Sequence, residues 1–203
     1  MLKLYYSPGA CALASHIALE EAGADYEIQA VNLRAGEQKT PEFLAINPAG
    51  STPALMTDRG PLTQNLVIMG YVAQTYPDAN LAPNDDSYAF GRMQAFNGYL
   101  ASSVHPAMGQ LLYAGLEGEA RDAALKLTLA KLGVVEDSLL GSPWAMGADY
   151  TVADGYLSVF TRWARQAGIL DGTRFARLND HLDRVQARPA VQRVLAAEGL
   201  QAV

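Results

Sequence analysis

Cys11, the single cysteine of the chain, is the first side chain whose type and position suit covalent chemistry. It follows a short apolar segment and a Ser-Pro-Gly turn, and a stretch of good helix formers begins beside it. Unpaired N–H groups and the helix dipole favour a thiolate at a helix N-terminus, so the pKa of this thiol should lie below that of free cysteine. The alternative is an inert cysteine packed as a small hydrophobic residue.

Two further segments suit the binding of a small peptide or amino acid. Thr52-Pro53 lies between a turn and a predicted strand, where a cis bond would expose the Thr52 backbone to a bound peptide. The residues by themselves favour an ordinary trans turn there. Gln64 and Asn65 begin a predicted helix, with Asn65 as its cap and Gln64 free to hold charged groups of an amino acid. A plain helix cap is the alternative.

The three histidines do not predict a metal centre. His16, His105 and His181 are far apart, and no pair has a ligand spacing such as HxH or HExxH. His16 follows Cys11 by five residues, about a turn and a half of helix, so we expect it to pack locally on another face. His105 has two interpretations, a residue lining a cleft or a structural histidine.

Composition excludes several classes of protein. The chain has 203 residues, of which 50% are hydrophobic and 18% charged, so it can bury a core and is not disordered. A net charge of −6 lacks the basic face of a nucleic-acid binder. There is no apolar stretch of about 18 residues and no signal-peptide pattern, and a lone cysteine fits a reducing compartment. We therefore expect a cytoplasmic protein with neither nucleic acid nor membrane as partner.

The elements that must position these residues fall into two parts. The first part is predicted to have the order β-α-β-α-β-β-α, an α/β pattern on a four-stranded sheet. Its predicted strands are Leu2–Tyr6, Tyr26–Leu33, Ala54–Thr57 and Pro61–Thr63, and its predicted helices are Ala10–Ala22, Pro41–Ile46 and one on which Leu66, Met69, Ala73 and Tyr76 share a face.

A segment rich in Pro, Asn and Asp, residues 78–86, is the predicted linker between domains at 1–77 and 87–203. The second domain is helical in pattern throughout, and Thr151–Asp154 has the pattern of a capping box that starts one helix. Its predicted helix faces are Phe90, Met93, Phe96 and Leu100; Leu125, Leu129, Leu132, Val135 and Leu139; and Val152, Tyr156, Val159 and Trp163. Shorter helices at Phe175–Ala187 and Ala190–Glu198 are predicted to be split by Pro189.

In this order and spacing, the motifs resemble those of the cytosolic glutathione transferases, most closely the bacterial beta class, over essentially the whole chain. The segments that carry the resemblance are Leu4–Cys11, with the characteristic cysteine; Phe43–Pro48 and Thr52–Leu55, around the family's cis-proline; Leu62–Asn65, at its γ-glutamyl clamp; Leu100–His105; Thr151–Asp154; and Trp163. The chain departs from the family at Asn65, where serine is usual, and at Pro106, where a basic residue is frequent. The loop Arg34–Lys39 is also one residue shorter than is usual in the family.

The resemblance implies an α/β thioredoxin-like N-terminal domain, an all-α C-terminal domain and a homodimer. It implies glutathione as cosubstrate, with no cofactor and no metal, and a catalytic role for Cys11 and His105 at the sulfur. Thr52 would pair through its backbone with the cysteinyl part of glutathione. The residues implied for glutathione binding are Tyr6, Arg34, Thr52, Pro53, Gln64, Asn65, Ser102 and Trp163.

The activity implied by the resemblance is attack of the glutathione thiolate on a hydrophobic electrophile, by addition or by displacement of a leaving group. A second interpretation is thiol transfer through a mixed disulfide at Cys11, by a monothiol route because the chain has no C-x-x-C pair. A third is a non-catalytic binding or regulatory protein with the same fold.

Overall fold

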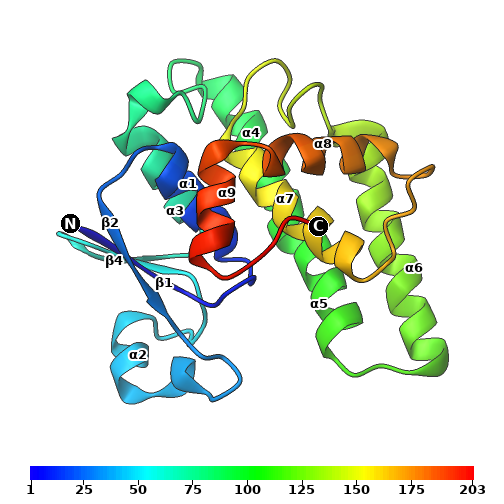
Figure 1. The fold of residues 1–203 in the computed structure, drawn as a ribbon, viewed down its shortest axis with the longest axis horizontal. Coiled ribbons are helices and arrows are strands. Elements are labelled where there is room, and N and C mark those ends of the chain that lie inside the picture. Colours follow the sequence, from blue (N-terminus) through cyan, green and yellow to red (C-terminus); the bar gives the residue numbers. More distant parts are fainter.

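A four-stranded mixed sheet forms the first part of the computed structural model, which describes residues 1–203 (Figure 1). The strands are β1 (Leu2–Tyr6), β2 (Tyr26–Ala30), β3 (Ala54–Thr57) and β4 (Gly60–Thr63), in the spatial order β2-β1-β3-β4. β1 runs parallel to β2 and antiparallel to β3, and β4 pairs antiparallel with β3. The central position of β1 brings the turn that follows it to the middle of the sheet edge.

Helices cover both faces of this sheet. α1 (Leu13–Glu21) and α3 (Asn65–Thr75) lie on one side, and the short α2 (Pro41–Ile46) lies on the other, after the 3₁₀ turn η1 (Glu37–Lys39) (Figure 1). The alternation of side chains along β1 explains these two layers. Leu2, Leu4 and Tyr6 are buried on one face of the strand. Tyr5 points to the other face, where its ring contacts that of Phe43 of α2, with ring centroids 6.0 Å apart.

The rest of the chain is helical, and none of its helices is both long and apolar enough to cross a membrane. Its elements are α4 (Ser87–Tyr99), the π-helical turn η3 (Leu100–Val104), α5 (His105–Tyr113), α6 (Gly118–Val134), the π-helical turn η4 (Val135–Leu139), α7 (Val152–Gln166), α8 (Ala176–Gln186) and α9 (Pro189–Ala197). The 3₁₀ turn η2 (Pro77–Ala79) precedes them.

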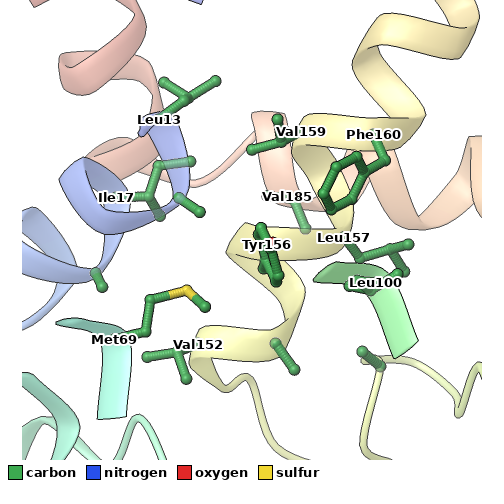
Figure 2. Packing of buried hydrophobic residues seen from close by; sticks show 14 of the residues in the cluster. Leu13, Ile17, Met69, Leu100, Val152, Tyr156, Leu157, Val159, Phe160 and Val185 are labelled. Carbon is green, nitrogen blue, oxygen red and sulfur yellow. The ribbon is translucent and has the colours of Figure 1, made fainter. Parts of the chain in front are cut away.

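Helix α7 joins the two parts of the fold. Its residues from Val152 to Ala164 are buried, and Figure 2 shows Leu13 and Ile17 of α1 beside its apolar side chains. Gly155 permits this close approach, since a Cβ atom there would lie 3.1 Å from Cγ2 of Ile17. A helix buried on all sides in this way joins the helical part to α1 and α3, which cover one face of the sheet.

The predicted capping box at the start of α7 is confirmed, and it is larger than the sequence pattern indicates. The Thr151 hydroxyl accepts a hydrogen bond from the Ala153 N–H, and the Asp154 carboxylate accepts one from the Thr151 N–H. The same carboxylate also accepts from the Ala145 N–H at 2.6 Å and pairs with Nε2 of His181 at 2.8 Å. Asp154 is fully buried, so it anchors a loop and α8 as well as α7.

The predicted order of elements is confirmed, with local differences. The first helix was expected from Ala10 but begins at Leu13, because residues 8–12 form turns. The second strand was expected to reach Leu33 but ends at Ala30. The last helix was expected from Ala190 but begins one residue earlier, at Pro189. Leu139, predicted on a buried helix face, is 37% exposed. The regular turns of α6 end at Val134, and the wider turn η4 rotates the residues after it.

Candidate functional site

A cavity of about 830 Å³ opens where β1 ends, between the sheet and the helical part. Its lining comprises Ser7–Cys11, Ala30–Arg34, Gln38, Gly50–Thr52, His105, Tyr113 and Trp163. A smaller cavity of about 190 Å³ shares Cys11, Ser51, Thr52 and His105 with it and extends to the start of α3. Another cavity, of about 730 Å³, lies between the segment Ala79–Asp85 and the start of α9, and it contains none of the predicted site residues. The two cavities that meet at Cys11 therefore form the candidate site.

Cys11 lies in the turn between β1 and α1, at the junction of these two cavities. Its Sγ is 3.7 Å from the carbonyl oxygen of Thr52. Burial raises the pKa of the thiol to about 11, although hydrogen bonds from Asn65 and the backbone act in the opposite direction. The predicted lowering of this pKa is therefore wrong, because desolvation outweighs the donors near the start of α1. The thiol is protonated at neutral pH.

The Thr52-Pro53 peptide bond is cis, so the trans turn that the residues by themselves favour is wrong. Thr52 comes two residues before β3 begins, and its N–H has no partner within the chain. Its carbonyl receives only the long contact from Cys11. The N–H and the C=O of Thr52, which lines the cavity, are thus both available to an extended ligand.

Gln64 and Asn65 differ sharply in their surroundings. Gln64 precedes α3 with φ of 72° and ψ of 126°, a conformation that costs a non-glycine residue about 1–3 kcal/mol. Its exposed side chain borders the small cavity, next to the unpaired N–H groups of the first turn of α3. Strain of this kind is typical of functional positions.

Asn65 is buried, and its amide joins α3 to the beginning of α1. Its Oδ1 accepts a hydrogen bond from the Ser15 hydroxyl at 2.6 Å, and its Nδ2 donates to the Cys11 carbonyl at 3.0 Å. The expected capping role for Asn65 is wrong, since it is the first residue of α3 and makes no cap. Its side chain instead positions the turn that carries Cys11.

His105 and Trp163 form the aromatic wall of the cavity on the helical side. Their ring centroids are 5.5 Å apart, and Phe160 lies behind His105 at 5.4 Å. Burial lowers the pKa of His105, so its imidazole is neutral at neutral pH. Trp163 Nε1 donates to the Gly9 carbonyl at 2.9 Å, which fixes the indole against the turn before Cys11.

Tyr6 and Ser102 were both predicted to bind glutathione, but neither lines either of the two cavities. Arg34, also predicted, lines the larger one. Tyr6 is buried, and its ring packs against His16 with centroids 5.7 Å apart, because this position of β1 faces α1. Burial raises the pKa of Tyr6 above its usual value. Ser102 is exposed and donates to the Gly98 carbonyl at 2.8 Å, so in η3 it is Ala101 that faces the cavity.

Several residues of the site are missed by sequence reasoning. His16 does not pack only locally, because its Nδ1 pairs at 2.8 Å with Glu198, which follows α9. The other carboxylate oxygen of Glu198 accepts from the Gly9 N–H, also at 2.8 Å. No local pattern signals a partner 182 residues away. Gln38 and Tyr113, likewise missed, line the larger cavity.

The arrangement suits a short peptide with a reactive sulfur. The Thr52 backbone can pair with an extended segment, and the start of α3 can hold a carboxylate. Cys11 and His105 both line the place where the two cavities join. No three His, Cys, Asp or Glu side chains are grouped so as to hold a metal ion.

Comparison with known proteins identifies this architecture. Residues 1–74 match the family model "Glutathione S-transferase, N-terminal domain". Glutathione S-transferase GstA of Escherichia coli O157:H7 is 34% identical over 98% of this chain and 100% of its own length. The beta class glutathione S-transferase of Sphingomonas chungbukensis is 39% identical, with a TM-score of 0.88 over 98% of this chain and 100% of that chain.

A glutathione transferase homologue from Sulfitobacter, solved with bound glutathione, has a TM-score of 0.89 at 31% identity and covers 99% of both chains. These similarities extend over the whole fold, from the first strand to the last helix. The expected α/β thioredoxin-like domain followed by an all-α part is confirmed, as is the resemblance to the bacterial beta class. The chain belongs to the glutathione S-transferase family.

Proposed function

We propose that the protein is a glutathione transferase that joins the glutathione thiolate to hydrophobic electrophiles. The backbone of Thr52 carries this proposal, because its N–H has no partner in the chain and faces the cavity next to Cys11. Glutathione is a short peptide whose cysteinyl residue can pair with such a backbone as an added strand. Its sulfur would then lie near Cys11 and His105.

The two ends of glutathione would bind on opposite sides of Thr52. The γ-glutamyl end would lie at the first turn of α3, where Gln64 and unpaired N–H groups face the small cavity. The glycine carboxylate would lie near Arg34 and Gln38, and Gln38 has a buried side-chain oxygen without a partner. Pro53 shapes the wall between them, and Asn65 acts by holding the Cys11 turn.

The protonation states of Cys11 and His105 favour conjugation. Neutral His105 can accept the proton of the glutathione thiol. Cys11 retains its own proton and can donate an S–H hydrogen bond to the resulting thiolate. The thiolate then attacks the electrophile, and the sulfur's electron pair forms the new C–S bond. In an addition the π pair of the electrophile moves away from the attacked carbon, and in a displacement the leaving group departs with its bonding pair. Thiol transfer would instead require an ionised Cys11, which burial disfavours.

The proposal also includes a homodimer and a location in the cytoplasm. Each subunit would have domains at residues 1–77 and 87–203, joined by a linker at 78–86. Two large apolar side chains, Val67 of α3 and Tyr88 of α4, are exposed on neighbouring helices, which supports a covered face. We expect a two-fold dimer in which the sheet domain of one subunit faces the helical domain of the other. A monomer mass in sedimentation at micromolar concentration would contradict it.

Retention on immobilised glutathione, followed by turnover of glutathione with an aryl halide, tests the function. We expect both for the unaltered protein. Gln64→Ala should raise KM for glutathione about tenfold, the effect of one hydrogen bond to a charged group. Gln74→Ala, a change at an exposed glutamine of α3, the helix that Gln64 precedes, is the matched control and should change nothing.

The outcomes separate the candidate functions. Retention without turnover would favour the non-catalytic binding protein. Reduction of a glutathione mixed disulfide that is lost in Cys11→Ala would favour the thiol transferase. Absence of both retention and turnover would refute the glutathione site itself.

A further inference from the structure

The small cavity at the start of α3 is lined without a single charged side chain. None of its ten lining residues is Asp, Glu, Lys or Arg. Burial raises the pKa of the Cys11 thiol to about 11 and lowers the pKa of His105, so both are neutral at neutral pH. The larger cavity next to it, by contrast, includes Arg34 in its wall. The candidate site therefore has one end with a cation and one end with no charge.

The helices around the small cavity lack charges over long stretches. No Asp, Glu, Lys or Arg occurs between Arg59 and Asp78, a segment that contains all of α3. None occurs between Arg92 and Glu117, which span the second half of α4, η3 and α5. A second copy of the chain that placed these same helices beside the cavity would bring no carboxylate from them either. A cationic group bound in the small cavity thus lacks a counter-charge from these helices.

The small cavity does offer hydrogen-bond donors. Ile68 is the first residue of α3 whose N–H bonds back, to the Gln64 carbonyl at 3.0 Å, so the N–H groups before it have no partner in the helix. Tyr156, which is only 2% exposed, lines the cavity, and its hydroxyl has no partner within the chain. Oδ1 of Asn65 already accepts from Ser15. These surroundings suit a carboxylate and offer an ammonium little beyond the amide oxygen of Gln64.

The γ-glutamyl end of glutathione carries an α-carboxylate and an α-ammonium, and the small cavity treats these two groups differently. We propose that the protein recognises this end of its thiol donor by the α-carboxylate alone, and that the α-amino group is dispensable. The class of donors is then wider than glutathione and includes peptides in which a plain glutaryl group replaces the γ-glutamyl residue. The inference rests on the proposed function, because it places the γ-glutamyl end at the start of α3.

Gln64 explains why an ammonium is tolerated without being selected. Its exposed side chain borders the small cavity, so the cavity opens to water beside it. An ammonium at this opening keeps its hydration, and its presence neither costs nor gains much binding free energy. A glutamate at this position would have the same length as Gln64 and would supply the missing counter-charge. Gln64 is therefore the residue that sets this specificity.

Three thiol donors test the inference on the unaltered protein. They are glutathione; glutaryl-cysteinylglycine, which lacks only the α-amino group; and γ-aminobutyryl-cysteinylglycine, which lacks only the α-carboxylate. The measurement is kcat/KM for each donor at a fixed concentration of 1-chloro-2,4-dinitrobenzene. We expect the glutaryl peptide to stay within about threefold of glutathione, and the γ-aminobutyryl peptide to lose about tenfold or more, the effect of one hydrogen bond to a charged group.

Gln64→Glu provides a second measurement, because it adds one carboxylate beside the bound α-ammonium. The ratio of kcat/KM for glutathione to that for the glutaryl peptide should rise about tenfold. Gln74→Glu makes the same change at an exposed glutamine of α3 that lines neither of the two cavities that meet at Cys11, and it should leave the ratio unchanged.

Two results would overturn the inference while leaving the proposed function intact. One is a loss of about tenfold or more with the glutaryl peptide in the unaltered protein, which would show that a carboxylate from elsewhere pairs with the ammonium. The other is a ratio that does not change in Gln64→Glu. Unaltered protein that turns over none of the three donors and is not retained on immobilised glutathione would overturn the proposed function itself.

Discussion

Asn65→Ala should show that this asparagine holds the site together by bonding within the protein. Its amide is buried between the Ser15 hydroxyl and the Cys11 carbonyl. The substitution leaves the hydroxyl without a partner, at a cost of about 1–3 kcal/mol for a buried group. The Cys11 carbonyl loses one of two donors, because it still accepts from the Ala14 N–H, and this adds about 1 kcal/mol. We expect a total loss of about 2–4 kcal/mol.

Urea unfolding followed by circular dichroism measures this loss, at one fixed protein concentration. A double-mutant cycle with Ser15→Ala isolates the hydrogen bond between the two side chains, with an expected coupling of about 1 kcal/mol. Asn84→Ala is a matched control, because its amide likewise donates to a backbone carbonyl, that of Ala73, and neither residue lines the two cavities that meet at Cys11. It should lower stability while leaving glutathione affinity unchanged.

The opposite pattern would refute the reasoning. If Asn65→Ala leaves the urea midpoint unchanged but abolishes glutathione binding, the amide contacts the ligand directly. A coupling near zero with Ser15→Ala would show that the 2.6 Å contact does not stabilise the fold.

The remaining predictions concern three acidic groups, the thiol of Cys11 and the buried carboxyl groups of Glu198 and Asp154. The thiol of Cys11, with its pKa raised to about 11, should be alkylated by iodoacetamide slowly at pH 8 and faster up to pH 11; a rate that levels off below pH 9 would contradict the burial argument. Glu198→Ala removes the partner of both His16 and Gly9 and should cost about 2–4 kcal/mol in urea unfolding, against less than about 0.5 kcal/mol for the exposed Glu119→Ala. Asp154→Ala removes the acceptor of four buried donors, the Ala145 and Thr151 N–H groups, the Thr151 hydroxyl and His181 Nε2. It should cost about 3–5 kcal/mol, more than loss of a simple cap; a cost below about 2 kcal/mol would mean that only the cap matters.

Local sequence patterns predicted the elements well because each element carries its own signal. The apolar run of β1, the proline that starts α2 and the capping box of α7 all lie where the pattern places them. The gathering of Cys11, Thr52 and His105 at one junction followed from the family resemblance, since nothing local links residues so far apart.

The failures arise where a property depends on the assembled fold. Sequence position placed Cys11 near a helix start, but the burial that raises its pKa comes from surrounding elements. Ser102 was expected to bind glutathione, but the π-helical turn η3 changes which of its side chains face inward. The bond from His16 to Glu198 joins distant segments, and no period or motif encodes it.

Gly9, two residues before Cys11, is held from the far end of the chain. Its N–H donates a hydrogen bond to the Glu198 carboxylate, and its carbonyl accepts one from Trp163 Nε1. The side chain of Leu200 lies against it, 3.5 Å from where a Cβ would be. During synthesis the sheet domain leaves the ribosome first, and all three of these supports emerge later. A nascent chain ending after α3 can therefore form its sheet while the Cys11 turn has none of its final contacts to the helical part. The order of translation thus delays completion of the candidate site until nearly the whole polypeptide has been made.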